Sequence, residues 1–225
     1  MKVLFEDSSL LVVYKSAGLK VYRDSKDEPE SLTDLLQEEV TSGEPVFPVH
    51  RLDSPTCGLV VFAKNAKVAN LLQKKFQEGQ IEKTYVAIVH GKIEADRGKI
   101  SRPLKHPKTK QLHKAVTEFQ VMERVEWKGE FFTVLTVQPL TGRFHQIRKH
   151  LDGEGHTIVG DPTYGKPKAR SKKSEPAFEK SNPFRRMALS AIQVDFIHPV
   201  SRRRIYLTEI PPDEFGKWIR HASKK

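Results

Sequence analysis

The fold is decided by the stretch VHRLDSPTCGLVVFAK, residues 49–64. Its second half, Gly58–Lys64, is short and almost entirely apolar, which predicts a strand buried on both faces. Its first half is polar and begins in an extended conformation, because Pro48 and Pro55 each disfavour the helical region for the preceding residue. We therefore expect a polar segment that runs directly into a buried strand.

Side chains alternate along such an extended segment. Arg51 and Asp53 then project to the same side, roughly 7 Å apart, while His50 and Leu52 face the other way. Because the buried strand follows at once, Asp53 lies at the edge of a strand rather than on a free loop. Two interpretations stay open here: an Arg51–Asp53 ion pair that closes a turn, or a functional carboxylate.

The rest of the chain alternates strand patterns with a few helical ones. Asn65 is a predicted N-cap, and the helix that follows it ends at Gly79. Ser31–Val40 is a second short helix with Ser31 as its N-cap. The remaining predicted elements are strands at Lys2–Phe5, Leu10–Lys15, Lys83–Val89, Ala115–Val125, Phe131–Pro139, Leu189–Phe196 and Arg204–Thr208, and a terminal helix at Pro212–His221. Strands outnumber helices in a mixed order, which predicts an α+β fold with a mostly antiparallel sheet.

Composition limits the class of protein. Hydrophobic residues make up 37% of the 225 residues, enough for a core, and we expect a single domain over residues 1–225. The sequence holds one cysteine, Cys57, so we expect neither a disulfide framework nor a multi-cysteine zinc site. No apolar run is long enough for a signal peptide or a membrane span, which predicts a soluble, cytoplasmic protein.

The formal net charge of +11 is unevenly distributed. Residues 1–44 carry 10 acidic and 5 basic side chains, whereas residues 45–225 carry 18 acidic and 34 basic ones. Two stretches, 97–114 and 166–182, are rich in Lys and Arg, and we expect both to be irregular loops. This excess favours a polyanionic partner, most simply nucleic acid, over a merely solvated basic face. A membrane surface is a weaker interpretation, since no basic stretch is an amphipathic helix with a bulky apolar face.

A second polar cluster occupies residues 141–151. Thr141 is a candidate N-cap of a helix whose apolar stripe is formed by Phe144, Ile147 and Leu151. Arg143 and Arg148 flank this stripe and would be partly buried, which is costly unless each finds an anion. Asp53 is a candidate partner for one arginine and an RNA phosphate for the other. The alternative is two arginines that snorkel on a surface helix.

Metal and nucleotide cofactors are not expected. His145 and His150 are five residues apart, which is off the i,i+4 face that binds zinc, and no carboxylate stands at motif spacing. The chain has neither a phosphate-cradling glycine loop nor a Rossmann fingerprint. Cys57 lacks a positioned base in the sequence and precedes an apolar strand, so it is interpreted as a small buried hydrophobic residue.

The stretch around Asp53 resembles the signature of the RluA-type pseudouridine synthase family, in His50-Arg51-Leu52-Asp53 and Thr56-Cys57-Gly58. Three further motifs follow in the order that the family has. They are a tyrosine motif, Lys83-Thr84-Tyr85-Val86-Ala87; an arginine motif, Thr141-Gly142-Arg143, His145-Gln146-Ile147-Arg148 and Gly160-Asp161-Pro162-Thr163-Tyr164-Gly165; and a closing strand with Leu189 and Ala191. The resemblance covers most of residues 1–210.

The resemblance implies a pseudouridine synthase fold with a catalytic cleft along the sheet. It implies that a specific uridine in structured RNA, ribosomal or transfer, flips out and is isomerised to pseudouridine without cofactor or metal. Asp53 would be the essential carboxylate, as nucleophile or as base; Arg148 would hold it ionised, and Tyr85 would stack on the base. The implied substrate-binding residues are His50, Arg51, Leu52, Thr56, Arg143, His145, Gln146 and Leu189. Arg51 is a candidate to enter the space that the flipped base leaves.

Two other functions fit the same charge. One is a catalytically silent RNA-binding protein on the same scaffold, which would not need Asp53. The other is a metal-dependent RNA hydrolase. In the enzyme interpretation we expect a monomer with no protein partner and no S4-type RNA-binding domain. The basic stretches 97–114 and 166–173 would then bind the flanking phosphates of the RNA.

Overall fold

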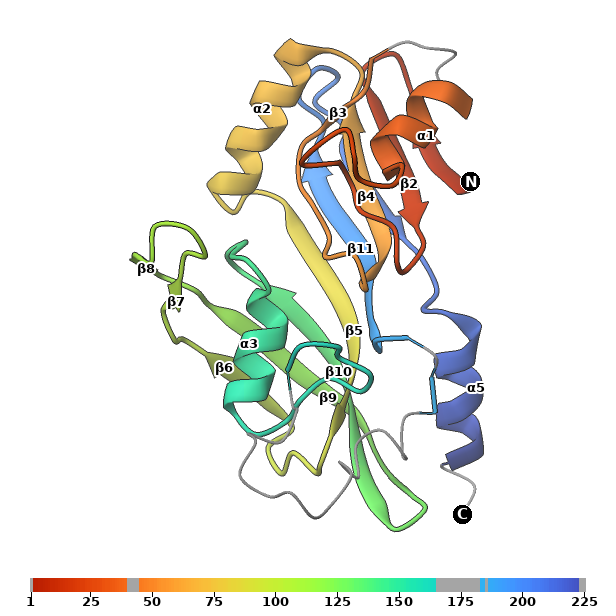
Figure 1. The fold of residues 1–225 in the computed structure, drawn as a ribbon, viewed down its shortest axis with the longest axis vertical. Helices are drawn as coiled ribbons and strands as arrows, with labels where there is room; N and C mark the ends of the chain where they lie inside the picture. The colour runs from red at the N-terminus through yellow and green to blue at the C-terminus, as the bar shows by residue number, and fades with distance from the viewer. Residues whose placement is uncertain (1, 40–44, 165–182, 185, 223–225) are drawn as a thin grey trace. The chain divides into compact units, whose positions relative to one another are not determined.

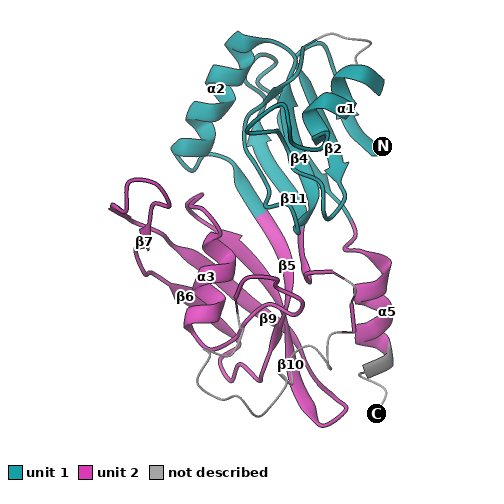
Figure 2. Ribbon diagram, in the orientation of Figure 1, with its two compact units in different colours: residues 1–83, 191–209 teal, residues 84–190, 210–225 magenta. Residues whose placement is uncertain are grey.

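The computed structural model describes residues 2–39, 45–164, 183–184 and 186–222 (Figure 1). The chain divides into two compact units (Figure 2). The first unit holds residues 1–83 and 191–209, and the second holds residues 84–190 and 210–225. The chain passes between the units three times: within β5 (Glu82–His90), within β11 (Leu189–Ile197) and between Glu209 and Ile210.

The strands of the first unit run in the order β1-β2-β4-β11. Strand β12 pairs with β11, and the short strand β3 pairs with β4. The elements are β1 (Lys2–Glu6), β2 (Leu10–Lys15), α1 (Leu32–Glu39), β3 (Phe47–Pro48), β4 (Cys57–Ala63), α2 (Ala66–Gln77) and β12 (Arg204–Thr208). β2 pairs antiparallel with both β1 and β4. The strands predicted at Lys2–Phe5 and Leu10–Lys15 are present and form a hairpin, and every residue of β4, the predicted buried strand, is buried.

Local capping explains where the helices of this unit begin and end. The side chain of Asn65 accepts a hydrogen bond of 2.9 Å from the backbone N–H of Val68, which is the predicted N-cap of α2. The helix stops before Gly79, whose positive φ of 71° is the left-handed conformation typical of a helix end. Ser31 precedes α1, and both the backbone N–H and the hydroxyl of Ser31 donate hydrogen bonds to the carboxylate of Asp34.

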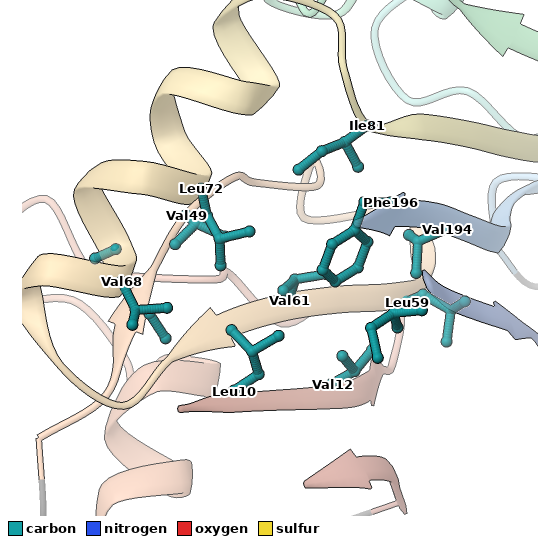
Figure 3. Close-up of a cluster of buried hydrophobic side chains, with 13 residues drawn as sticks. Leu10, Val12, Val49, Leu59, Val61, Val68, Leu72, Ile81, Val194 and Phe196 are labelled. Atoms are coloured by element: carbon teal, nitrogen blue, oxygen red, sulfur yellow. The ribbon is translucent and has the colours of Figure 1, made fainter. Parts of the chain in front are cut away.

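A hydrophobic core joins α2 to the sheet of the first unit. Val68 and Leu72 of α2 point from the helix toward β4 (Figure 3). The buried residues of this cluster come from β2, β4, α2, β11 and the segments beside them: Leu10, Val12, Val49, Leu59, Val61, Ala63, Val68, Ala69, Leu72, Ile81, Val194, Phe196 and Ile205. β4 supplies Leu59, Val61 and Ala63 to this cluster, more than any other strand.

The strands of the second unit run in the order β5-β10-β9-β6. Its elements are β6 (Arg97–Ile100), β7 (Leu104–Lys105), β8 (Leu112–His113), β9 (Thr117–Trp127), β10 (Glu130–Pro139), α3 (Gln146–Gly153) and α5 (Asp213–Ala222), together with most of β5. The long β9–β10 hairpin turns at Lys128 and Gly129, which both have positive φ, as a tight hairpin turn requires. α5 buries Phe215 and Trp218, and the Trp218 ring meets those of Trp127, Phe132 and Phe184 edge to face.

The prediction that residues 97–114 form an irregular loop is wrong. β6 pairs antiparallel with β9, and β7 pairs with β8 in a small hairpin. In β6 the basic side chains Arg97 and Lys99 are exposed while Ile100 is buried. Charged residues on the free edge of a sheet oppose further strand pairing, so a basic composition is compatible with an edge strand. The other predicted loop, 166–182, lies outside the described residues.

The α+β fold and the mostly antiparallel strand pairing are confirmed. Among the helices in the described part of the chain, none is long and apolar enough to cross a membrane.

Gly58 is required where β4 lies against β11. Its φ is +120°, and a Cβ atom built on it would stand 2.1 Å from the carbonyl oxygen and 2.5 Å from the amide nitrogen of Ala191. We therefore expect Gly58→Ala to lower the free energy of unfolding by about 2–4 kcal/mol, measured by urea titration. Gly129→Ala is the control: its φ is +78° but nothing lies within 4 Å of the added Cβ. Equal losses in the two variants would show that the contact with Ala191 is unimportant.

Candidate active site

Asp53 opens a tight turn directly before β4. The backbone N–H of Thr56 donates a 3.0 Å hydrogen bond to the carbonyl oxygen of Asp53. The middle of this turn is tied to the loop after β2, because Gly18 donates its N–H to the carbonyl of Ser54 at 2.8 Å and accepts the Ser54 hydroxyl at 2.7 Å. Thr56 is buried and Asp53 is half-buried. The carboxylate is therefore carried by a turn that the rest of the first unit holds in place.

A lysine that the sequence analysis did not assign lies beneath this turn. Lys15, the last residue of β2, is fully buried, and its Nζ donates hydrogen bonds to three carbonyl oxygens, those of Ser16 (3.0 Å), Leu19 (2.7 Å) and Ser54 (3.1 Å). Burial lowers the pKa of Lys15 to about 8, and its electrostatic interactions with Cys57 and Asp53 oppose this shift. A buried cation thus joins the two loops that support Asp53.

Arg51 does not pair with Asp53. Among the described residues it contacts Tyr22: Nη1 donates a 2.9 Å hydrogen bond to the phenol oxygen, and the guanidinium carbon lies 5.2 Å from the ring centroid. The interpretation of an Arg51–Asp53 ion pair that closes the turn is therefore wrong. Arg51 is exposed to solvent, as a side chain that meets a large ligand needs to be.

His50 is held within the first unit by a hydrogen bond and by ring stacking. Its Nε2 accepts a 2.9 Å hydrogen bond from the backbone N–H of Val61, at the place where β3 has ended and no longer pairs with β4. The ring stacks on Phe76 at 4.4 Å between centroids. Burial, aided by the charge of Lys83, lowers the pKa of His50 to about 3, so the imidazole is neutral at physiological pH. Leu52, two residues on, is also buried.

The second group of predicted site residues surrounds α3. This helix begins at Gln146, and its N-cap is His145 in the left-handed conformation, so the prediction of Thr141 as N-cap is wrong. Thr141 is used elsewhere: its hydroxyl accepts the N–H of Val116 and donates to the Gln146 side chain. Phe144 consequently lies before the helix and is 41% exposed, which leaves Ile147 and Leu151 as the buried stripe.

Two buried side chains one turn apart fasten α3 to the start of β9. The Gln146 amide donates to the carbonyl of Val116 at 2.9 Å and to the Thr117 hydroxyl at 3.0 Å. His150 places Nδ1 2.9 Å from the Thr117 hydroxyl and Nε2 3.0 Å from the carbonyl oxygen of Arg102. Buried polar groups with such complete hydrogen bonding fix the orientation of a helix.

Arg148 is a buried cation with a buried carboxylate partner. Only 2% of its side chain is exposed, and it meets Asp161 in a bidentate pair, Nε to Oδ2 at 2.7 Å and Nη2 to Oδ1 at 2.8 Å. Nη2 also donates to the Thr163 hydroxyl at 2.9 Å, and the guanidinium carbon lies 5.0 Å from the Tyr164 ring centroid. For Arg148 the alternative of a snorkelling surface arginine is therefore wrong.

Sequence reasoning did not assign Asp161 a role. The carboxylate is fully buried, and besides Arg148 it accepts hydrogen bonds from the backbone N–H groups of Thr163 and Tyr164. The sequence did contain a signal for Asp161, because this residue lies in the last part of the arginine motif, Gly160-Asp161-Pro162-Thr163-Tyr164-Gly165. Its pairing with Arg148 depends on the tertiary fold and on no local pattern.

The remaining predicted site residues also have definite places. Tyr85 on β5 and Leu189 at the start of β11 are buried. Arg143 is exposed and donates to the carbonyl of Lys114 at 3.1 Å, and His145 places Nδ1 3.1 Å from the Tyr164 hydroxyl. The structure thus brings together His50, Arg51, Leu52, Asp53 and Thr56 in the first unit, and Tyr85, Arg143, His145, Gln146, Arg148 and Leu189 belong to the second.

Within the described ranges, no group of three or more His, Cys, Asp or Glu side chains is arranged to hold a metal ion.

The family is established by comparison with known proteins. A family model described as RNA pseudouridylate synthase matches residues 9–152. The chain belongs to this family: it is an RNA pseudouridine synthase, an isomerase, as the resemblance of its motifs predicted. It is 32% identical to tRNA pseudouridine synthase C of Haemophilus ducreyi over 93% of the chain and 90% of that relative. It is 37% identical to the dual-specificity RNA pseudouridine synthase RluA of Vibrio vulnificus over 89% of the chain and 79% of that relative.

Solved structures share the fold. Human RNA pseudouridylate synthase domain containing 4 matches with a TM-score of 0.78 at 24% identity, over 99% of this chain and 93% of that one. Human RNA pseudouridylate synthase domain containing 1 matches with a TM-score of 0.75 at 24% identity, over 94% of this chain and 83% of that one.

Because the Arg148–Asp161 pair is buried, we expect the loss of one carboxylate charge to lower the stability of the protein strongly. Asp161→Asn removes the negative charge that accepts two hydrogen bonds from the buried guanidinium of Arg148. We expect the free energy of unfolding, measured by urea titration, to fall by about 3–5 kcal/mol.

A second bidentate pair in the chain is the matched control. Arg204 holds Asp195 through Nε and Nη2, but the arginine side chain is 66% exposed. Because an ion pair exposed to solvent contributes little to stability, Asp195→Asn is expected to change the free energy of unfolding only slightly. If both variants lost the same stability, burial would not be what makes the Arg148–Asp161 pair important.

Proposed function

We propose that this synthase acts on one specific uridine in structured RNA, transfer or ribosomal, and that Asp53 is its essential carboxylate. The observation that carries the proposal is the turn at residues 53–56, which holds a half-buried carboxylate at the entry of the buried strand β4. The tertiary hydrogen bonds from Lys15 and Gly18 restrain this turn, which is a property expected of a catalytic group. The printed names of the two relatives, one for transfer RNA and one dual-specificity, support these RNA classes.

The reaction conserves every atom of the nucleotide. The C1′–N1 bond breaks, the uracil rotates, C5 bonds to C1′, and the proton lost from C5 is balanced by one gained at N1. Asp53 acts as a nucleophile or as a base on the sugar, and both roles require the ionised carboxylate. The target base leaves its stack before it reaches Asp53, at a cost of a few kcal/mol that stacking and phosphate contacts offset.

Arg148 is proposed to hold and orient Asp53. A guanidinium carries five N–H donors in a fixed plane, so it can bind Asp161 and a second carboxylate together. Asp161 and Thr163 engage Nε and Nη2, and this presets the plane of the group. Tyr85 stacks on the flipped base and Leu189 closes the pocket from the apolar side in this proposal.

The proposed substrate-binding residues divide by exposure. Arg51 and Arg143 are exposed cations, and we assign them to RNA contact, with Arg51 entering the space left by the flipped base. His145, at the N-cap of α3 beside Tyr164, is assigned to the same surface. The other members are buried or bound by the protein itself, so we assign them to shaping the site: His50, Leu52, Thr56 and Gln146.

We propose that the β7–β8 hairpin binds the phosphate backbone of the RNA. Its strands and tip, residues 104–113, expose Lys105, Lys108 and Lys110. Lysines on a narrow two-stranded ribbon are suited to phosphate contact, and affinity that depends on them falls steeply with salt. We also propose that residues 1–225 act as one catalytic domain, in the cytoplasm, as a monomer and without cofactor or metal.

The test of the proposed chemistry is Asp53→Asn. Pseudouridine is measured by chemical labelling of unmodified transfer RNA and ribosomal RNA transcripts, and of total RNA from cells with and without the gene. With the wild-type protein we expect one labelled uridine. Asp53→Asn should lower the rate of pseudouridine formation by about 10²–10⁴-fold and should change RNA affinity little.

Asp96→Asn is the control, since Asp96 is an exposed carboxylate whose partner is Arg124. Full activity of Asp53→Asn would contradict the assigned chemistry. A wild-type protein that binds both RNAs and modifies neither would favour the catalytically silent RNA-binding alternative.

A further inference from the structure

Two lysines of the first unit are shielded from water, Lys15 completely and Lys83 in part, and they differ in what compensates their charge. Lys15 has three carbonyl oxygens around its Nζ. Lys83, at the start of β5, is half-buried, and burial lowers its pKa to about 8, so its amine still carries a proton at neutral pH. The described residues offer Lys83 no hydrogen-bond acceptor and no carboxylate within 4 Å; its contact is the face of the Phe76 ring, 5.7 Å from Nζ.

The groups beside Lys83 cannot neutralise it. His50 stacks on the same Phe76 ring, but its Nε2 lone pair is already used by the N–H of Val61. Its imidazole is neutral, so it brings no negative charge. The adjacent acid, Glu82, projects to the opposite side of the strand and interacts electrostatically with Arg204. Lys83 is therefore a partly desolvated cation that the described part of the fold leaves without a counter-ion.

An uncompensated cation of this kind destabilises the free protein, which makes a purely structural role unfavourable. We propose that Lys83 binds a backbone phosphate of the substrate RNA. An ammonium group presents three donors as a compact point charge, which suits a single phosphate oxygen. Lys83 stands two residues before Tyr85 on β5, and side chains two residues apart project from the same side of a strand. The phosphate would therefore belong to a nucleotide near the target base. The proposal rests on RNA being the substrate but not on the chemistry of Asp53.

The test is a salt titration of RNA binding. The probe is an end-labelled, unmodified transfer RNA transcript, with an unmodified ribosomal RNA transcript in parallel, and affinity is measured by fluorescence anisotropy. Loss of one phosphate contact in Lys83→Met should reduce the slope of log K against log salt by about 0.7–0.9 and weaken binding about five- to tenfold at 0.1 M salt. Lys83→Arg keeps the charge and should retain most of the slope.

Lys67→Met is the matched control, because Lys67 is an exposed lysine in the first turn of α2. It should change neither the slope nor the affinity. Unchanged slope and affinity in Lys83→Met on both transcripts would overturn the proposal. So would a lower melting temperature of free Lys83→Met, since the proposal requires that the charge serves the RNA and not the fold. Pseudouridine formation is a separate readout, so its absence would overturn the proposed function and leave the binding result standing.

Discussion

Burial of positive charge is the constraint on which both groups of site residues depend. In the second unit, Arg148 is almost completely removed from water, and it is stable there because Asp161 and Thr163 saturate one edge of its guanidinium. In the first unit, Lys15 is fully buried and is stabilised by three carbonyl oxygens from two loops. Each of these cations organises the backbone around it, because its partners must stay within hydrogen-bond distance.

The two anchors act on different parts of the proposed chemistry. Lys15 ties the loop after β2 to Ser54, and therefore restrains the turn that carries Asp53. Asp161 restrains Arg148, while Gln146 and His150 hold the helix from which Arg148 projects. Lys83 differs from both, since the described residues provide it with no compensating acceptor. A cation with an internal partner is interpreted as structural or positioning, and one without is interpreted as a site for an anion from outside.

Local signals in the sequence were sufficient for most of the fold. Asn65 and Gly79 bound α2 because capping depends on neighbouring residues alone, and the apolar run of β4 is buried as its composition predicts. Features that depend on distant residues could not be predicted in this way. The hydroxyl of Thr141 is used by Val116, so the helix begins later than its N-cap pattern indicates. The basic composition of residues 97–114 hides the pairing of β6 with β9, and nothing local links Arg148 to Asp161 or Lys15 to Ser54.

The most direct test of the central claim is release of tritium from RNA labelled at C5 of uridine. Formation of the C5–C1′ bond must expel the hydrogen from C5, so a uridine isomerase releases tritium to water while the RNA keeps its length. We expect the wild-type chain to release one tritium for each pseudouridine formed, with no change when a chelator is added. Bound RNA that retains all its tritium, or RNA that is cut, would contradict the account.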